Sequence, residues 1–286
     1  MSTTSTKSFR FAGIQLHVTS DKEVNLRHAV EKVKEASKNG ARVVCLPEIF
    51  NSPYQSSLFP QYAEDVSDPS SPSPKALSDV AKEEKIYLIG GSIPEREAIN
   101  GEDKIYNTCL IYGPDGKLLA KHRKVHLFDI DVPGKITFRE SDTLTGGNDV
   151  TVFPTEWCDI GVGICYDIRF PELAQVATSK GSKMLVYPGA FNMTTGPAHW
   201  ELLLRSRAVD NQLFVAGVAP ARNLESSYHS WGHTSVIEPW GSVLSTTEEG
   251  PSIVYADIDL DRVDDFRSSI PTLRQKRRDL YELVEK

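Results

Sequence analysis

Short apolar runs alternate with amphipathic segments along the first half of the chain. The runs have the length of strands and occupy residues 9–16, 41–46, 86–93 and 104–112. Between the first two, residues 25–39 carry apolar positions at helical spacing, and Gly40 ends that segment as a C-terminal cap would. Strand, helix and strand in succession predict a βαβ unit and therefore an α/β protein.

The second half of the chain shows a similar order. Strands are expected at 160–164, 184–191, 214–217, 234–241 and 252–258, and helices at 170–180 and 200–212, after the one expected at 76–85 in the first half. In the last of these helices, Leu203, Leu204, Ala208 and Val209 are expected to face inward. Residues 43–50 resemble 184–191, and 87–90 resemble 214–217, so the two halves are predicted to be structural copies. Such a repeat suits two sheets with helices outside them.

Three stretches lack this patterning. Residues 51–75 are rich in Pro and Ser and are expected to pass over a strand end, where active-site lids commonly lie. Residues 129–149 are expected to be irregular. Residues 263–286 read as a polar, charged tail, with the basic cluster at 274–278 on one face of a helix. Without a linker or composition shift, we expect a disordered tail over 1–8 and a single domain over 9–286.

Charge and hydropathy exclude two classes of partner. The 286 residues carry a formal net charge of −7, whereas a nucleic-acid binder needs a basic stripe that displaces counterions. No apolar run approaches the roughly 18 to 20 residues that span a bilayer, and the first seven residues lack the apolar stretch of a signal peptide. We expect a cytoplasmic protein with no nucleic-acid or membrane partner, and leave a mitochondrial fraction open.

Cysteine and histidine spacing favours neither a disulfide scaffold nor a metal centre. The four cysteines, Cys45, Cys109, Cys158 and Cys165, are scattered and form no C-x-x-C pair, so reduced thiols are expected. His122 and His126 are four residues apart, but no third ligand is evident nearby. The expectation is no metal and no cofactor.

Reactive side chains follow three of the expected strands. Glu48 comes after Pro47 at the end of one run. Lys124 lies near the end of 118–126, the expected hairpin partner of 104–112, and Cys165 stands where an apolar run turns into polar sequence. Functional groups gather at strand ends in open α/β folds. A carboxylate could take the thiol proton, the thiolate could attack a carbonyl, and the lysine and the Tyr166 N–H could hold the oxyanion.

Each of these residues also has a structural interpretation. Cys165 alone fits a buried structural cysteine, Glu48 a solvated turn residue and Lys124 a surface cation. A cysteine protease would use a histidine base in place of Glu48, and the available histidines are His122, His126, His199, His229 and His233. None of them lies in a papain or caspase context.

Three motif blocks resemble the carbon–nitrogen hydrolase (nitrilase) superfamily, in the same order and across nearly the whole chain. They are residues 46–48, 123–127 and 163–172. The resemblance implies a four-layer α-β-β-α sandwich with two mixed sheets and the helices outside. It also implies that Glu48 is the general base, that Lys124 stabilises the tetrahedral intermediate and that Cys165 is the nucleophile. A further family glutamate that positions the lysine and substrate matches Glu140, with Glu172 as runner-up.

Residues 50–54, 128–138 and 187–200 resemble the omega-amidase branch, which hydrolyses the terminal amide of 2-oxoglutaramate and 2-oxosuccinamate. Such substrates need a cation for the far carboxylate. Arg169, four residues past Cys165, is the candidate, with an ion pair to Asp167 or Glu172 as the alternative. The other substrate-binding residues expected are Tyr54, Tyr166, Phe191 and Thr195. The resemblance further implies a homodimer, with residues 262–286 as a contact element.

Other functions stay open at this point. A nitrilase would use the same three residues to make a carboxylate directly from a nitrile, and another small-molecule amidase would differ only in its pocket. A non-catalytic relative that binds ligands is also conceivable, although intact Glu48, Lys124, Glu140 and Cys165 argue against it.

Overall fold

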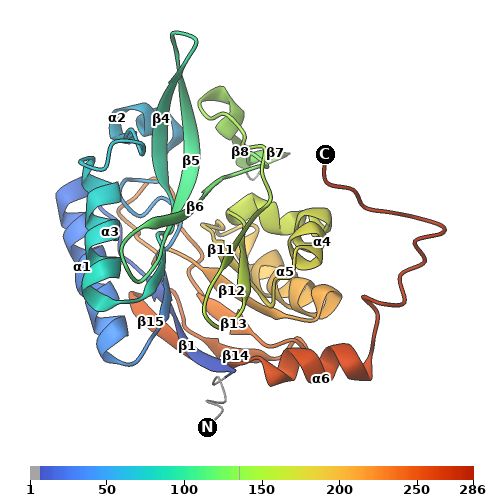
Figure 1. The fold of residues 1–286 in the computed structure, drawn as a ribbon. Helices are drawn as coiled ribbons and strands as arrows, with labels where there is room; N and C mark the ends of the chain where they lie inside the picture. Colours follow the sequence, from blue (N-terminus) through green and yellow to red (C-terminus); the bar gives the residue numbers. More distant parts are fainter. Residues whose placement is uncertain (1–6, 135) are drawn as a thin grey trace.

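Figure 1 shows a computed structural model of the protein, which describes residues 7–134 and 136–286. The first strand begins at Ser8, so the last residue of the expected N-terminal tail belongs to a sheet. Residues 1–6 of that tail lie outside the described residues.

A seven-stranded mixed sheet holds the first half of the chain together with one late strand. In spatial order its strands are β15 (Ser252–Asp259), β1 (Ser8–Gln15), β2 (Val43–Cys45), β3 (Tyr87–Ile89), β5 (Glu102–Tyr112) and β4 (Ile93–Ile99), with β6 (Leu118–Arg123) also paired to β5. Strands β1, β2 and β3 are parallel to one another, and the outer pairs are antiparallel.

The second sheet has six strands and repeats this plan. Its spatial order is β14 (Val243–Thr246), β13 (Ser235–Ile237), β12 (Phe214–Val218), β11 (Met184–Pro188), β10 (Asp159–Val162) and β9 (Thr151–Pro154). Strands β10, β11 and β12 are parallel and are flanked by antiparallel strands on both sides. Strand β11 thus occupies the place of β2, and β12 that of β3, as the resemblances between these segments predicted.

Helices cover the outer face of each sheet (Figure 1). Helices α1 (Lys22–Lys38) and α3 (Pro72–Glu84) lie on one side of the molecule, and α4 (Pro171–Ser179) and α5 (Gly196–Asn211) on the other. The predicted four-layer α-β-β-α sandwich is therefore confirmed. None of the helices in the described ranges combines the length and apolar composition that a bilayer span requires.

The central strands β2, β11 and β12 are buried along their whole length because both faces of the sheets are covered there. In β1 and β2, Phe11 and Cys45 pack into the large cluster between the sheets, whereas Ala12 and Val44 pack beneath α1 and α3. Phe11 is fully buried, and burial of such a side chain stabilises the fold by about 1.5–3 kcal/mol.

Residues 129–149 are more ordered than the sequence indicated. They contain a hairpin of β7 (Asp129–Val132) and β8 (Ile136–Arg139), followed by the 3₁₀ turn η2 (Glu140–Asp142). The strands have only four residues each, too few for a clear alternation of polar and apolar positions.

The excursion at 51–75 also contains short helices. These are η1 (Ser56–Leu58) and α2 (Phe59–Tyr62), and α3 begins at Pro72, earlier than expected. Proline is favoured in the first helical turn, where its missing N–H leaves no bond unmade.

Two expectations for the last helices are wrong. Val209 was expected to face inward from α5, but its side chain is 45% exposed, whereas Leu204 and Ala208 are buried. The basic cluster at 274–278 lies on no helix, because α6 (Asp261–Ser269) ends just before Pro271 and the following residues form turns and an extended tail (Figure 1). Proline commonly follows a helix end because it cannot continue the hydrogen-bond ladder.

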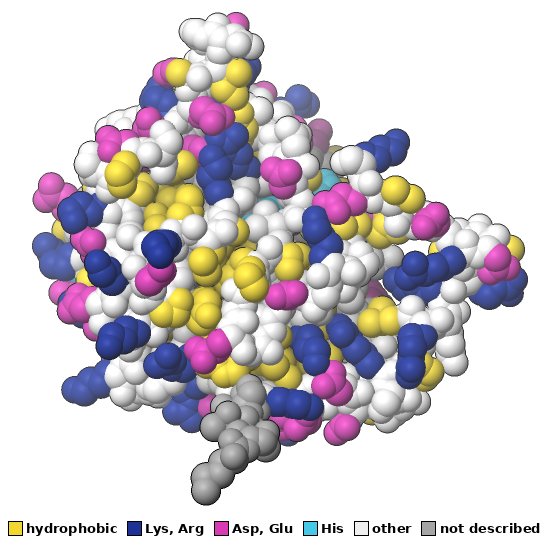
Figure 2. Space-filling model, in the orientation of Figure 1, with side chains coloured by type: hydrophobic (Ala, Val, Ile, Leu, Met, Phe, Trp, Pro, Cys, Tyr) yellow, Lys and Arg dark blue, Asp and Glu magenta, His cyan; other side chains and the backbone are white. Residues whose placement is uncertain are grey.

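Surface charge is mixed on the face shown in Figure 2. Lys and Arg side chains alternate there with Asp and Glu, and no broad basic stripe crosses this face.

Candidate active site

Glu48 lies three residues beyond β2, in a turn whose backbone is unusual. Ile49 has φ +49°, a left-handed conformation that is a rare outlier for a β-branched residue and marks local strain. The Ile49 N–H donates to Ser92 Oγ at 3.0 Å. At Gly91 a Cβ atom would lie 2.2 Å from the Pro47 carbonyl oxygen, so only glycine allows this approach. The turn buries the Glu48 side chain inside the molecule.

Cys165 lies at an equally strained corner of the second sheet. It begins the 3₁₀ turn η3 (Cys165–Arg169) shortly after β10 and has φ +49°. The chain after β11 passes close beneath it, since a Cβ atom on Gly189 would be 3.1 Å from the Cys165 Cα. The cysteine thus occupies the strand-end corner expected from the sequence, but it is buried rather than open to solvent.

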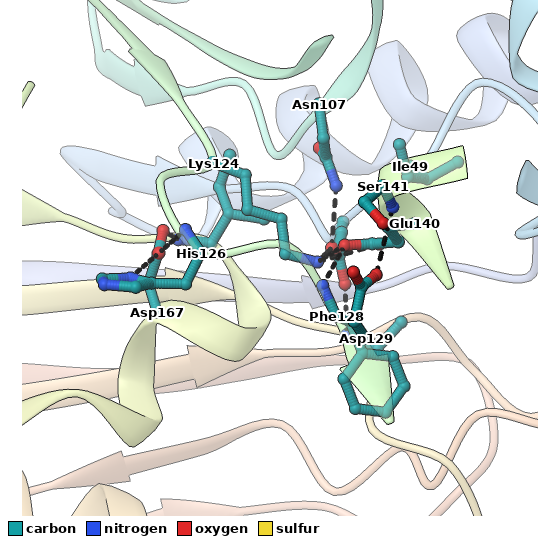
Figure 3. Close-up of polar contacts among 12 residues, drawn as sticks. Ile49, Asn107, Lys124, His126, Phe128, Asp129, Glu140, Ser141 and Asp167 are labelled. Carbon is teal, nitrogen blue, oxygen red and sulfur yellow. Dashed lines mark hydrogen bonds and ion pairs between the residues drawn. The ribbon is translucent and has the colours of Figure 1, made fainter. Parts of the chain in front are cut away.

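Lys124 connects two carboxylates in this buried region. It follows β6, and its Nζ lies 3.1 Å from Glu48 Oε1 and 2.8 Å from Glu140 Oε2. Figure 3 shows the lysine side chain extending toward Glu140, whose Oε2 accepts a bond of 2.7 Å from the Phe128 N–H. Removing one member of a buried ion pair leaves an uncompensated charge and costs about 3–5 kcal/mol.

The Glu48 carboxylate accepts further hydrogen bonds. Oε2 accepts one of 2.7 Å from the Ala190 N–H, and Oε1 accepts one of 2.9 Å from Asn107 Nδ2. The Tyr54 hydroxyl lies 2.8 Å from Glu140 Oε1 and 3.3 Å from Glu48 Oε1. These groups hold the Glu48 carboxylate in one orientation.

Burial and charge shape the proton affinities of these groups. Burial raises the pKa of Glu48 against the opposing charge of Lys124. Burial, with the charge of Glu48, also raises the pKa of Cys165 well above its usual range. For Lys124, burial lowers the pKa, but Glu140 and Glu48 outweigh it and the net change is upward. The resting arrangement is therefore a neutral thiol beside a carboxylate of increased basicity and a charged lysine.

Arg169 lies at the end of the turn that Cys165 begins. Its guanidinium stands 4.8 Å from the centre of the Phe191 ring and 5.7 Å from that of Tyr166, and its Nη1 is 3.3 Å from His199 Nδ1. Within residues 7–134 and 136–286 it forms no ion pair with Asp167, Glu172 or another carboxylate. Burial lowers the pKa of Arg169, as expected for a partly desolvated cation.

Aromatic side chains line the remaining wall. The Tyr54 and Tyr228 ring centres are 4.5 Å apart, and Phe138 lies 6.2 Å from Tyr54. A cavity of about 350 Å³ borders the site here, and its lining includes Glu48, Tyr54 and Tyr228. Its size suits a small molecule.

Not every expected residue joins the cluster. The Thr195 hydroxyl bonds Asn192 Oδ1 at 3.2 Å, near the start of α5, and Glu172 is exposed in the first turn of α4. Asn107 and Tyr228 were not expected. Asn107 is a polar residue inside the mostly apolar run of β5, where it stands next to Thr108, and Tyr228 lies in a loop without periodic pattern.

The histidines do not take the position of a catalytic base. Both His122 and His126 bond Asp167, and the carboxylate whose charge helps to raise the pKa of the Cys165 thiol is that of Glu48. The part of the chain that the structure describes contains no group of three His, Cys, Asp or Glu side chains placed to hold a metal ion.

Comparisons with known proteins agree with this geometry. The family model described as carbon–nitrogen hydrolase matches residues 10–268. The chain is 57% identical over 274 residues to omega-amidase NIT2 of Homo sapiens, covering 96% of this chain and 97% of that protein. It is 56% identical to omega-amidase NIT2 of Mus musculus, covering 98% and 99%. Among solved structures, Saccharomyces cerevisiae Nit3, a member of branch 10 of the nitrilase superfamily, matches with TM-score 0.87 and 45% identity over 94% of this chain and 97% of that one.

Proposed function

This chain belongs to the carbon–nitrogen hydrolase family, in its omega-amidase branch, and we propose that it hydrolyses the terminal amide of 2-oxoglutaramate and 2-oxosuccinamate. It is a hydrolase acting on amide carbon–nitrogen bonds. The observation that carries the substrate class is Arg169, a half-buried guanidinium four residues from Cys165 that has no carboxylate partner in the described residues. A substrate with a second, distal carboxylate would supply that partner.

The first half of the proposed reaction forms a thioester. Glu48 accepts the Cys165 proton as the sulfur attacks the amide carbon, and the carbonyl oxygen becomes an oxyanion. Lys124 Nζ and the Tyr166 N–H stabilise that charge. Glu48 then gives its proton to the nitrogen, the carbon–nitrogen bond breaks, and ammonia leaves.

The second half releases the acid. Water attacks the thioester carbon while Glu48 takes one of its protons, and the oxyanion again forms beside Lys124. The carbon–sulfur bond breaks, the proton returns to Cys165, and the 2-oxo dicarboxylate departs. Glu140 and Tyr54 hold Lys124 and Glu48 in place throughout, because Glu140 pairs with the Lys124 ammonium and the Tyr54 hydroxyl contacts both carboxylates.

Arg169 would select the substrate. Its planar guanidinium can donate two parallel hydrogen bonds to a carboxylate, and the Phe191 and Tyr166 rings on which it rests limit its motion. Tyr54 is placed at the reacting end of the pocket by its contacts with Glu48 and Glu140. We retain Thr195 as a substrate contact on the resemblance alone.

We also propose that residues 9–286 act as one domain in a homodimer. The segment 262–286 carries Leu280, Tyr281 and Val284 on its surface, with 70%, 60% and 64% of each exposed. An extended segment with apolar side chains suits contact with a second copy. All four cysteines are free, which favours a reducing compartment such as the cytoplasm.

Ammonia release across matched substrates tests the function. The panel is 2-oxoglutaramate, 2-oxosuccinamate, glutamine, asparagine, butyramide and butyronitrile, with the Cys165→Ala variant as the blank. We expect the two 2-oxo monoamides to give the highest kcat/KM. An equal or higher kcat/KM for butyramide would overturn the substrate proposal, and preference for butyronitrile would favour the alternative of a nitrilase.

A further inference from the structure

Asp167 lies two residues after Cys165 and has no part in the chemistry described above. Its carboxylate is completely buried. A buried carboxylate is costly unless hydrogen bonds replace its hydration, so its donors show what this residue does in the fold.

Those donors come from the segments that carry the nucleophile and the lysine. Oδ2 accepts a bond of 2.9 Å from the N–H of Ile164, the residue before Cys165. Oδ1 accepts bonds of 2.9 Å from the His126 N–H and 2.8 Å from His126 Nδ1. His122 Nε2 lies 3.2 Å from Oδ2. His122 and His126 flank Lys124 by two residues on each side, so one side chain holds both segments (Figure 3).

The contacts also define the state of both histidines. Burial tends to raise the pKa of Asp167, but the bonds from His122 and His126 outweigh it and hold the pKa below its usual range. The carboxylate can therefore only accept, and His126 Nδ1 and His122 Nε2 carry the protons. His122 Nδ1 in turn lies 2.9 Å from the Thr151 hydroxyl oxygen, so both ring nitrogens have a partner.

The Lys124 segment is also held within its own sheet, where β6 pairs with β5 up to Arg123. The Lys124 N–H donates to the Asn107 carbonyl at 2.8 Å, and the Lys124 carbonyl accepts from the Gly147 N–H at 2.9 Å. These bonds attach the backbone of the lysine to strand β5 and to the loop that contains Gly147. The hydrogen bonds of Asp167 attach the segment to the turn that presents the thiol, alongside the stacking of His126 on Phe170.

We propose that Asp167 is a positioning residue that, through His122 and His126, fixes the Lys124 ammonium relative to the Cys165 sulfur. A displacement of about 1 Å in such a pair can lower a rate by roughly 10²-fold. The role deepens the proposed amidase mechanism, but the arrangement of thiol and ammonium can be measured without any amide substrate.

Matched substitutions at position 126 isolate the side-chain donor. His126→Asn keeps an N–H group close to the Nδ1 position, whereas His126→Leu removes it. Both variants lose the stacking of the imidazole on Phe170, whose ring centre is 3.6 Å away, so that contact cancels in the comparison. Asp167→Asn replaces one carboxylate oxygen with an NH₂ group. In either amide orientation, that NH₂ group faces N–H donors that now lack an acceptor.

Two readouts are taken well below each variant's melting temperature. The first is kcat and KM for 2-oxoglutaramate. The second is the rate of Cys165 alkylation by iodoacetamide, which reports the thiolate and requires no amide turnover. Lys124 favours that thiolate by its charge, so a displaced lysine slows the alkylation.

We expect Asp167→Asn to lower kcat about 10²-fold with little change in KM, and to slow alkylation. His126→Leu should lose roughly 10-fold in kcat, and His126→Asn should recover most of it. Equal defects in His126→Asn and His126→Leu, or normal alkylation in Asp167→Asn, would overturn the positioning role. If the wild type fails to hydrolyse 2-oxoglutaramate, the substrate proposal fails, and the alkylation rates still decide the role of Asp167.

Glu64→Gln is the control for a general loss of stability. Glu64 is also buried and accepts bonds from Ser73 and Asn51, but it contacts neither Lys124 nor Cys165. We expect it to lower the melting temperature while leaving kcat and alkylation unchanged. A loss of kcat in Glu64→Gln equal to that in Asp167→Asn would show that Asp167 acts only through the stability of the fold.

Discussion

The backbone N–H of Ala190 donates to Oε2 of Glu48 at 2.7 Å, and this bond joins the two halves of the molecule at equivalent places. Glu48 follows β2 in the first sheet, and Ala190 follows β11, which occupies the same position in the second. The duplicated architecture thus brings two corresponding strand ends face to face. One supplies the proposed base, and the other supplies a fixed donor that orients it.

The Glu48→Gln variant should lose turnover. Glutamine cannot take the Cys165 proton, and its NH₂ group would face the donors of Ala190, Asn107 or Lys124. We expect kcat to fall by about 10²–10⁴-fold, the usual contribution of a general base. Steady-state ammonia release measures this, with circular dichroism as the check on folding. Wild-type kcat in a folded Glu48→Gln enzyme would rule out this base.

The acid side of the pH profile should reflect the environment of Glu48. The base must be ionised to accept the thiol proton, and burial raises the pKa of Glu48 above 4.5, the ordinary value for a glutamate. Activity is therefore present above that raised pKa and lost as pH falls through it. We expect the acid limb of kcat/KM to have its midpoint above 4.5. A midpoint at or below that of an ordinary glutamate, after correction for unfolding, would contradict this.

Substitutions at Cys165 should separate activity from backbone strain. Both Cys165→Ala and Cys165→Gly remove the nucleophile and should release no ammonia. Because φ is +49° at this position, alanine keeps the strain and glycine relieves it. We expect Cys165→Gly to be more stable than Cys165→Ala by about 1 kcal/mol in urea unfolding. Ammonia release by either variant would overturn the thioester mechanism.

Asp167 should make a pH-dependent contribution to stability. Its pKa in the folded state lies below that of an unfolded aspartate, near 3.9, so the folded state favours the ionised form. The stabilisation is complete above about pH 3.9 and is lost as pH falls toward the folded pKa. The difference in unfolding free energy between wild type and Asp167→Asn should therefore shrink on acidification. A difference that is constant between neutral pH and pH 3 would contradict this.

Much of the fold could be predicted because the central buried strands are continuous apolar runs. The helices that cover them carry apolar residues at helical spacing. Glu48, Lys124 and Cys165 stand near strand ends, but it is the three motif blocks shared with the carbon–nitrogen hydrolase family that single them out in the sequence. Other features depend on contacts between distant segments. Asn107 matters only because β5 passes Glu48, 59 residues away in the chain. Tyr228 matters only because its loop returns to stack on Tyr54.

The hairpin of β7 and β8 is another feature that the sequence pattern does not predict. Its strands are too short for their pattern to distinguish them from a loop, yet the hairpin leads directly into Glu140 and places Phe138 in the aromatic wall. The sequence suggests Asp167 only as a possible ion-pair partner of Arg169. Its bonds to His122 and His126 arise from the way η3 packs against the end of β6, which no local pattern indicates.

Arg169→Ala should change substrate selection rather than the reaction itself. The guanidinium touches no reacting atom in the proposed mechanism, so its loss removes binding of the distal carboxylate in ground and transition states alike. A charged hydrogen bond contributes about 1.5–3 kcal/mol, which corresponds to an increase in KM of roughly 10- to 150-fold for 2-oxoglutaramate, with kcat little changed. Butyramide, which has no distal carboxylate, is the control, and its kcat/KM should stay within about twofold because it never used the missing ion pair. Arg169→Lys should recover only part of the affinity, since an ammonium cannot donate the paired, parallel bonds of a guanidinium. An equal loss of kcat/KM on both substrates would mean that Arg169 supports the shape of the pocket and does not bind the distal carboxylate.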